Sequence, residues 1–441
     1  MSVEQKVLPK YKIATRSSHR TSRRITEHID WFTVLIYFLL VAMGWMNIYA
    51  AVYSPDNIVN IMSFDINSGK QLVWIGASLL LILVLLVVDY KVYEHLAYPI
   101  YGAIILLLLV TLVVAKPIAG SRSWLDLGAG IRLQPAELAK FATALAVSKY
   151  LSNVNLSQQK FKDQLGLAAL TFLPPVIIIL QNETGSALVF AAFILAFFRE
   201  GMSPMILIIG SVAAAIFILT LLVPKLYLII GITALMGLAV WLDYRLLRRI
   251  KTMAAMLLLI VGMIFSVDYF VNNILQPHQQ NRIQALINPE ADPLGYGWNV
   301  TQSKIAIGSG GFWGKGFLEG TQTKFDFVPE QSTDFIFCTI GEEHGWIGSS
   351  ILIALFIFLL IRIVKIAERQ RSVFGRTYGY CVASIIFFHF LINVGMTIGL
   401  APVVGIPLPF FSYGGSSLWS FTILLFILIA LDANRSKDLA R

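Results

Sequence analysis

Charged residues stand directly in front of an apolar run in the stretch VPEQSTDFIFCTIGEEHGWIG, residues 328–348. Asp334 is followed at once by Phe335, Ile336 and Phe337. Apolar neighbours disfavour the ionised form of a carboxyl group and so raise its basicity. A carboxylate in this place could act as a general base, and as an alternative it could cap the helix that follows.

A glycine-rich segment just before this stretch suits an anionic ligand. In QSKIAIGSGGFWGKGF, Lys304 and Lys315 flank glycines whose backbone N–H groups could receive anionic oxygens. The same glycines are equally typical of a set of tight turns. The two lysines favour a phosphate site over the turns alone.

Two further polar sets lie beside predicted membrane helices. In GSRSWLDLGAGIRLQPAELAK, Glu137 and Lys140 share one helix face at i and i+3. Charges in a span are costly unless they are paired or line a cavity, so this is either an internal ion pair or a cavity wall with Arg122 at its rim. In LAPVVGIPLPFFSYGGSSLWS, the prolines forbid a continuous helix. Ser416 then lies at a helix start that could receive an anion or pack against a neighbouring helix.

The composition identifies the surroundings of these residues. The chain of 441 residues is 57% hydrophobic and only 13% charged, with a mean hydropathy of +0.74. A membrane helix needs roughly 20 apolar residues. We therefore predict an all-α polytopic membrane protein with about twelve spans, near 31–52, 71–89, 96–115, 135–151, 166–181, 185–199, 204–223, 225–244, 252–275, 346–368, 374–400 and 409–432.

Lysine and arginine predict how the spans are oriented, because short cytoplasmic loops carry the positive excess. This rule places both termini in the cytoplasm and residues 276–345 in a long extracytoplasmic loop. We expect a basic tail at 1–29, a membrane domain at 30–435 and a short tail at 436–441. The net charge of +9 follows from the same bias, so we predict no nucleic-acid partner.

The two cysteines predict no covalent or metal-binding framework. Cys338 and Cys381 lie far apart in the sequence, in or beside predicted spans. We expect no disulfide between them and no cysteine-based metal site. No cluster of histidine and cysteine indicates a tight metal site either.

Several long motifs, in this order, resemble the SEDS family. They are GSRSWLDLG, QPAELAK, PHQQNRI, QSKIAIGSGGFWGKGF, TDFIFCTIGEEHG and GIPLPFFSYGGSS, and the resemblance covers roughly residues 30–435. The form PVVGIPLPF is closer to the elongation branch, RodA, than to the division branch, FtsW. Family members typically have ten spans, so the pair near 204–244 is an expected addition. Asn182 and Glu183 stand where the family usually has Pro and Asp.

The resemblance implies a peptidoglycan glycosyltransferase of cell elongation, which polymerises lipid II into β-1,4 glycan strands at the outer face of the cytoplasmic membrane. It also implies that Asp334 is the residue required for polymerisation, as general base for an inverting displacement of lipid pyrophosphate. The candidates for substrate binding are Arg122, Glu137, Lys140, Lys304, Lys315 and Ser416.

A divalent cation, Mg²⁺ or Mn²⁺, could share the neutralisation of the pyrophosphate. The implied partners are a class B penicillin-binding protein, which cross-links the strands, and other membrane proteins of the elongation complex. Alternative functions are a lipid II flippase, a division-type polymerase, and an inactive scaffold that activates a partner.

Overall fold

A computed structural model describes most of the chain. The described residues are 29–53, 63–118, 120–126, 128, 131–154, 161–242, 250–274, 280, 296–325 and 327–435. The two predicted tails, apart from Ile29, lie outside them, as does most of the predicted loop before residue 296.

The described residues form an all-helical architecture with one short antiparallel hairpin, β1 (Leu125–Asp126) paired with β2 (Arg132–Leu133). A 3₁₀ turn (Val189–Ala192) and a π turn (Phe270–Ile274) extend neighbouring helices. The α-helices are α1 (Trp31–Val52), α2 (Asn67–Val87), α3 (Tyr90–His95), α4 (Ala97–Val114), α5 (Pro135–Asn153), α6 (Phe161–Leu180), α7 (Thr184–Leu188), α8 (Phe193–Arg199), α9 (Pro204–Leu222), α10 (Lys225–Leu242), α11 (Ile250–Tyr269), α13 (Tyr296–Gly310), α14 (Thr321–Lys324), α15 (Ile336–Glu368), α16 (Val373–Thr397) and α17 (Gly415–Ala433).

The prediction of an all-α polytopic membrane protein is confirmed, whereas the count of twelve spans is not. Within the described ranges, 10 helices are long and apolar enough to cross a membrane, namely α1, α2, α4, α6, α9, α10, α11, α15, α16 and α17. The predicted span at 135–151 is α5, whose many polar side chains lower its hydropathy. The predicted span at 185–199 is divided among α7, a 3₁₀ turn and α8.

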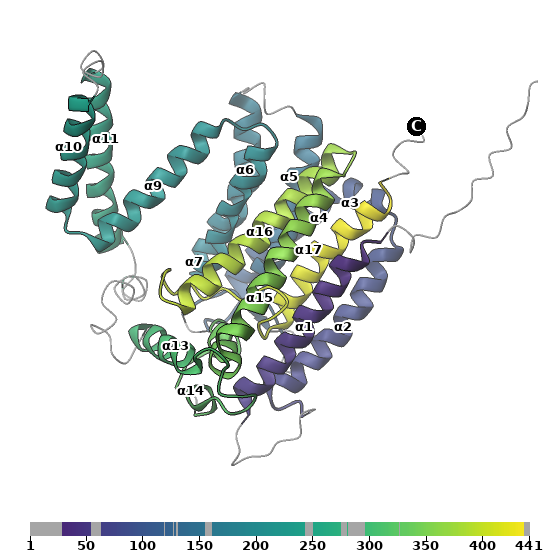
Figure 1. Cartoon of the computed structure of the whole chain (residues 1–441). Helices are drawn as coiled ribbons and strands as arrows, with labels where there is room; N and C mark the ends of the chain where they lie inside the picture. The colour runs from purple at the N-terminus through teal and green to yellow at the C-terminus, as the bar shows by residue number, and fades with distance from the viewer. Residues whose placement is uncertain are drawn as a thin grey trace, which may run out of the picture.

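The helices α5, α16 and α17 form the centre of the bundle (Figure 1). α17 packs against α2 and α5, while α16 packs against α5 and α15. α17 is apolar along most of its length, and 89% of its most apolar 18-residue stretch is buried inside the protein. A helix of this kind is stable only when other helices surround it. α5 can approach its neighbours closely because its buried face is rich in alanine.

The helices α9, α10 and α11 form an arm that stands apart from the bundle (Figure 1). Only 6% of the most apolar 18-residue stretch of α9, and 6% of that of α10, is buried inside the protein. Their exposed side chains are mostly apolar, as suits contact with lipid. Lys225 of α10 and Asp268 of α11 form an ion pair that joins two of the arm helices. The predicted additional pair near 204–244 corresponds to α9 and α10.

α15 begins at Ile336, earlier than the predicted start near residue 346, so the end of the predicted loop is helical. The helix is kinked at Gly345, where φ is 62° and ψ is −154°, a conformation that only glycine adopts readily. The preceding loop bonds the backbone groups around the kink. Trp346 N donates to Gly311 O over 2.9 Å, and Lys315 N donates to Glu342 O over 3.0 Å. Hydropathy alone does not reveal such a loop-supported turn.

Candidate active site

Asp334 lies just before α15, with a partly exposed side chain. The N-cap position of α15 is Phe335, whose side chain makes no cap bond, and Asp334 is the residue before it. The backbone before Asp334 is hydrogen-bonded to the loop between α16 and α17, which we call the proline-rich loop. Ser412 Oγ donates to Thr333 O over 2.6 Å, and Tyr413 N donates to Ser332 O over 2.9 Å.

Asn393 of α16 fixes Asp334 itself. Its Nδ2 donates to Asp334 O and to Ile406 O, over 2.8 Å in each case. The side chain is fully buried, and its Oδ1 has no hydrogen-bond partner among the described residues. Gly405 of the proline-rich loop lies next to the carboxylate of Asp334, because a Cβ added to this glycine would lie 3.2 Å from Asp334 Oδ2. The carboxylate therefore sits against the backbone of the proline-rich loop.

A second polar group is buried between α5, α16 and α17. Lys140 Nζ lies 2.6 Å from Glu137 Oε1 and 2.8 Å from His389 Nε2, and its side chain is 0% exposed. His389 Nδ1 lies 3.0 Å from Pro407 O. Since a carbonyl oxygen only accepts, Nδ1 carries the proton and Nε2 accepts from Lys140. The ammonium also lies 5.4 Å from the ring centre of Phe421.

Asp334 and Lys140 both contact α16, which was not among the segments predicted from the sequence to form the site. His389 and Asn393 are four residues apart on one face of this helix, and both bond the loop around Pro407. The signal that could have revealed them is a pair of polar side chains one turn apart in an apolar span. Glu137 Oε2 remains buried without a partner among the described residues.

The acid that replaces the expected Asp has a defined position. Ser121 Oγ and Ser123 Oγ donate to Glu183 Oε2 over 3.0 Å and 2.9 Å. The residue between the serines, Arg122, bonds Gln181 O through its backbone N over 3.0 Å and has an exposed side chain. Glu183 therefore holds the segment that presents Arg122.

Lys304 lies on the same side of the molecule as Asp334. It is exposed on α13, and a Cβ added at Gly399 would lie 3.2 Å from its Cδ. α13 is anchored by Ser303 Oγ, which donates to Thr397 O over 2.9 Å. Val300 of the same helix belongs to a small apolar cluster with Phe335, the residue after Asp334.

Lys315 and the glycines around it pack against α15. Lys315 Nζ lies 2.7 Å from Glu342 Oε1 and 2.7 Å from Thr321 Oγ1. The backbone N–H groups of Lys315 and Gly316 donate to the carbonyls of Glu342 and Glu343 over 3.0 Å and 2.9 Å. Of the glycine N–H groups that were predicted to receive anionic oxygens, that of Gly316 bonds the kinked helix in the structure.

Ser416 joins two segments of the chain. Its Oγ accepts from Gln134 N over 3.1 Å and lies 3.3 Å from Arg132 O, as a donor to that carbonyl. The first turn of α17 is thereby connected to the segment that leads into α5. Ser416 is 5% exposed.

Across the part of the chain that the structure describes, no group of three or more His, Cys, Asp or Glu side chains is arranged to hold a metal ion. Cys338 and Cys381 are both buried and free. The described residues therefore offer no preformed set of three or more such ligands for a divalent cation.

Comparison with known proteins gives consistent relatives. The family described as "Cell cycle protein", which groups FtsW, RodA and SpoVE, matches residues 30–248 and 228–437. The peptidoglycan glycosyltransferase RodA of Treponema pallidum is 30% identical over 436 residues, which cover 93% of this chain and 99% of that protein. The peptidoglycan glycosyltransferase MrdB of Escherichia coli is 33% identical over 392 residues, covering 89% of this chain and 90% of that one.

Solved structures support the same assignment. A chain from a peptidoglycan synthase complex, described as coordinating polymerization and crosslinking, has a TM-score of 0.68 at 27% identity and covers 93% of this chain and 99% of its own. The rod shape determining protein RodA of Thermus thermophilus has a TM-score of 0.60 at 25% identity, covering 92% and 97%. The chain belongs to the FtsW, RodA and SpoVE family, and it is most similar in these comparisons to RodA-type members.

Proposed function

We propose that the chain is a peptidoglycan glycosyltransferase of the elongation type, which polymerises lipid II at the outer face of the cytoplasmic membrane. Relatives that match nearly the whole chain carry the name peptidoglycan glycosyltransferase. The observation that carries the proposal is the placement of Asp334. Its carboxylate is partly exposed, while its backbone is held by the fully buried Asn393.

Asp334 acts as the general base. The 4-hydroxyl of the acceptor sugar loses a proton to this carboxylate as its oxygen attacks C1 of the donor sugar. The bond from C1 to the lipid pyrophosphate breaks in the same displacement, which inverts the α-linked donor to a β-1,4 bond without a covalent enzyme intermediate. A positioned base contributes typically about 10²- to 10⁴-fold to such a step.

Arg122 and Lys304 bind the pyrophosphate, because both have exposed side chains on segments that the fold holds in place. Cations placed where negative charge grows stabilise the leaving group. The remaining candidates are each bonded within the protein, so in this mechanism they support the walls of the site. They are Glu137, Lys140, Lys315 and Ser416.

Basic side chains gather at the opposite end of the bundle from Asp334. Arg362 and Arg369, near the end of α15, contact Asp30 at the start of α1, and Arg369 also contacts Asp432 at the end of α17. By the positive-inside rule this end faces the cytoplasm. Both chain termini are then cytoplasmic, and Asp334 lies on the outer side.

A class B penicillin-binding protein is the proposed partner, together with other membrane proteins of the elongation complex. The proposal is supported by the similarity to a chain from a peptidoglycan synthase complex. In this arrangement the present chain makes the glycan strand and the partner cross-links it.

The test is a polymerisation assay in liposomes that present lipid II on the accessible face, with wild-type complex, Asp334→Asn complex and the partner alone. We expect glycan polymer from the wild type only. Translocation of lipid II without polymer would support a flippase instead. Polymer from the Asp334→Asn complex would remove Asp334 from the role of base.

A matched control separates loss of chemistry from loss of charge. Asp65 is an exposed acid whose Oδ2 accepts from Ser63 Oγ over 3.0 Å. Asp65→Asn makes the same chemical change as Asp334→Asn, outside the proposed site. We expect this variant to retain wild-type polymerisation.

A further inference from the structure

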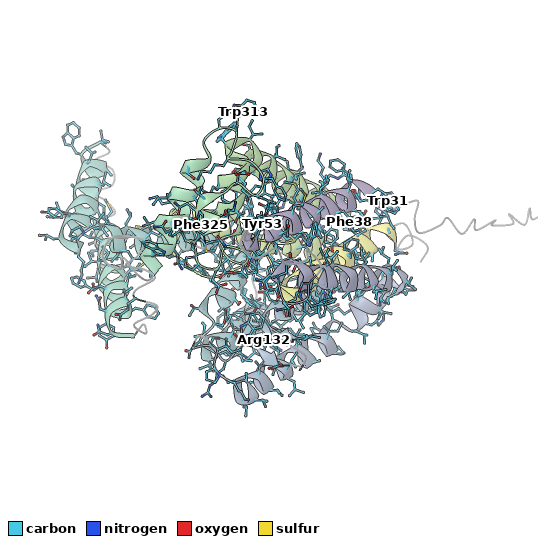
Figure 2. The ribbon with its side chains drawn as sticks, turned by 90° about the horizontal axis from the view of Figure 1, so that it is seen from below. Trp31, Phe38, Tyr53, Arg132, Trp313 and Phe325 are labelled. Carbon is cyan, nitrogen blue, oxygen red and sulfur yellow. The ribbon has the colours of Figure 1, made fainter. Side chains whose placement is uncertain are left out.

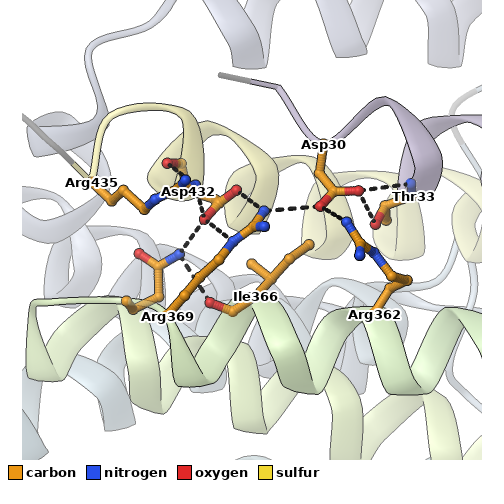
Figure 3. Close-up of polar contacts among 8 residues, drawn as sticks. Asp30, Thr33, Arg362, Ile366, Arg369, Asp432 and Arg435 are labelled. Carbon is orange, nitrogen blue, oxygen red and sulfur yellow. Dashed lines mark hydrogen bonds and ion pairs between the residues drawn. The ribbon is translucent and has the colours of Figure 1, made fainter. Parts of the chain in front are cut away.

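The end of the bundle opposite Asp334 carries a charged cluster that the proposed reaction does not use (Figure 3). We call it the inner cluster; its members are Asp30, Arg362, Arg369, Asp432 and Arg435. Arg362 pairs with Asp30, and Arg369 Nη2 lies 2.9 Å from Asp30 Oδ2. Arg369 Nε and Arg435 Nη1 each lie 2.8 Å from Asp432 Oδ1. The inner cluster joins the ends of α1, α15 and α17.

The inner cluster retains positive charge. Burial disfavours the ionised form of Asp30, but hydrogen bonds from Thr33 and Arg362 outweigh this effect and lower its pKa. The side chains of Asp30 and Asp432 are 2% and 0% exposed, whereas those of the three arginines are about a third exposed, at 30 to 33%. Three guanidinium groups thus face two buried carboxylates, and the excess positive charge is on the exposed side.

A cavity of about 350 Å³ opens beside these arginines. Its lining consists of three basic residues, one acid and three apolar residues: Arg362, Arg369, Arg435, Asp30, Ile29, Trp31 and Phe32. The guanidinium of Arg362 lies 5.4 Å from the ring centre of Phe32. The Nε of Arg362 is buried and has no hydrogen-bond partner among the described residues. A buried donor without an acceptor is costly, and a ligand oxygen that reached this N–H would remove that cost.

The aromatic side chains in the lining of the cavity indicate a ligand with an apolar part. Trp31 is 60% exposed and Phe32 is 49% exposed in the first turn of a membrane helix. Aromatic side chains at this level mark the interface between headgroups and acyl chains. Leu35 and Phe38 continue the exposed apolar surface along α1 toward the membrane interior, and Figure 2 shows Trp31 and Phe38 on this helix.

The charges on the chain argue against its own ends as the occupant. The sequence before α1 includes RSSHRTSRR, residues 16–24, which is followed by ITEHID, and residues 436–441 are SKDLAR. The first is strongly basic and the second has no net negative charge, so neither complements a positive cavity. An anion from the membrane does.

We propose that this cavity binds the headgroup of one anionic phospholipid of the cytoplasmic leaflet. The phosphate accepts hydrogen bonds from Arg362 and Arg435, and the glycerol and upper acyl chain lie along Phe32 and Leu35. Basic pockets between membrane helices on the cytoplasmic side are suited to such headgroups. The proposal uses the orientation inferred above but does not depend on the proposed catalysis.

The test measures lipid binding to the purified full chain in detergent, by native mass spectrometry and by thermal shift. Phosphatidylglycerol is compared with phosphatidylcholine, and glycerol 3-phosphate serves as the free anion. We expect retention of phosphatidylglycerol, with a higher melting temperature. Arg362→Gln and Arg435→Gln should each weaken this binding about fivefold, the effect of one basic residue at a membrane surface.

Arg371→Gln is the matched control, because it removes an exposed arginine near the end of the same helix that does not line the cavity. It should retain wild-type preference for phosphatidylglycerol. If Arg362→Gln does not fold, Phe32→Ala leaves every ion pair intact and should still weaken binding.

Three results would overturn the proposal. The first is equal lipid preference in Arg435→Gln, Phe32→Ala and Arg371→Gln. The second is protection by glycerol 3-phosphate as strong as that by phosphatidylglycerol, which would indicate a site for soluble anions. The third is a loss of thermal stability in Arg362→Gln with unchanged binding of phosphatidylglycerol, which would make the inner cluster a structural contact only.

Discussion

Asn393 and Asp334 are joined by one hydrogen bond, in which the Nδ2 of Asn393 donates to the backbone oxygen of Asp334 over 2.8 Å. The same nitrogen donates to Ile406 O over 2.8 Å. One buried amide thus sets the distance between the proposed base and the proline-rich loop. A base acts only within hydrogen-bond reach of the proton it takes. Asn393 is therefore a positioning residue of the proposed reaction.

Asn393→Asp should lower polymerisation by about 10²-fold, because the new carboxylate repels both carbonyl oxygens and a displacement of about 1 Å at a reacting group has that effect. Lipid II binding should change much less. Both are measured on purified complex, as polymer formed and lipid II retained. Asn153→Asp, which alters an exposed amide bonded to Lys149 O, is the control and should retain activity. Equal polymerisation by both variants would contradict the positioning role.

Gly405→Ala should also lower polymerisation. Gly405 has a φ of +73°, and an added Cβ would press against Asp334 Oδ2. Gly128→Ala is a matched control, since its φ is +85° and nothing lies within 4 Å of an added Cβ. Both variants should lose about 1–2 kcal/mol of stability from the left-handed backbone. Activity per folded protein should fall only for Gly405→Ala, and a similar fall for Gly128→Ala would show that strain alone is responsible.

Lys140→Met should destabilise the fold by about 3–5 kcal/mol, because it leaves the Glu137 carboxylate buried without its cation. The double variant Glu137→Gln with Lys140→Met should recover part of this loss. The comparison is Lys149→Met, which breaks a half-exposed pair with Glu94 and should cost about 0–1 kcal/mol. Thermal unfolding in detergent measures all three. Similar melting temperatures for the two single variants would refute a structural role for the buried pair.

Lys304→Ala should raise the concentration of lipid II needed for half-maximal rate about tenfold or more, since a hydrogen bond to a charged group contributes about 1.5–3 kcal/mol. The donor carries its pyrophosphate charge before reaction, so binding itself weakens. Lys324, at the end of α14, is another lysine of the segment predicted to be outside, and Lys324→Ala serves as the control. Unchanged binding by Lys304→Ala would exclude Lys304 from the pyrophosphate site.

Orientation is tested by cysteine labelling in intact spheroplasts with an impermeant thiol reagent. A cysteine at Phe325, which is 63% exposed, should react, and one at Arg371 should not. The native thiols give little background because Cys338 and Cys381 are both buried. The reverse pattern would invert the proposed topology and remove the basis for an outer-face reaction.

The helical architecture could be predicted from the sequence because lipid imposes length and apolarity on every span. The contacts that the polar side chains make with one another could not be predicted in this way. Lys140 meets His389 across 249 residues of sequence, a contact created only when α5 packs against α16. Asn393 gave a recognisable signal as a polar residue in an apolar helix, but its bond to Asp334 depends on where the loop before α15 passes.

The loop from Gly310 to Gly316 was predictable as a glycine-rich segment but not as a partner of α15. Lys315 is predicted to bind substrate, and in the structure its side chain pairs with Glu342. The kink at Gly345 leaves backbone groups of the helix to bond the loop. A sequence pattern does not show which of two neighbouring segments will take those bonds.

The contact at the kink also sets the limits of sequence variation. A Cβ at Gly310 or Gly314 would lie 2.1 Å from a carbonyl oxygen of α15, and one at Gly345 would lie 2.3 Å from Gly314 N. Backbone meets backbone here, so no neighbouring side chain can be trimmed to make room. A substitution at any of these three glycines would therefore have to move the backbone of the loop or of α15.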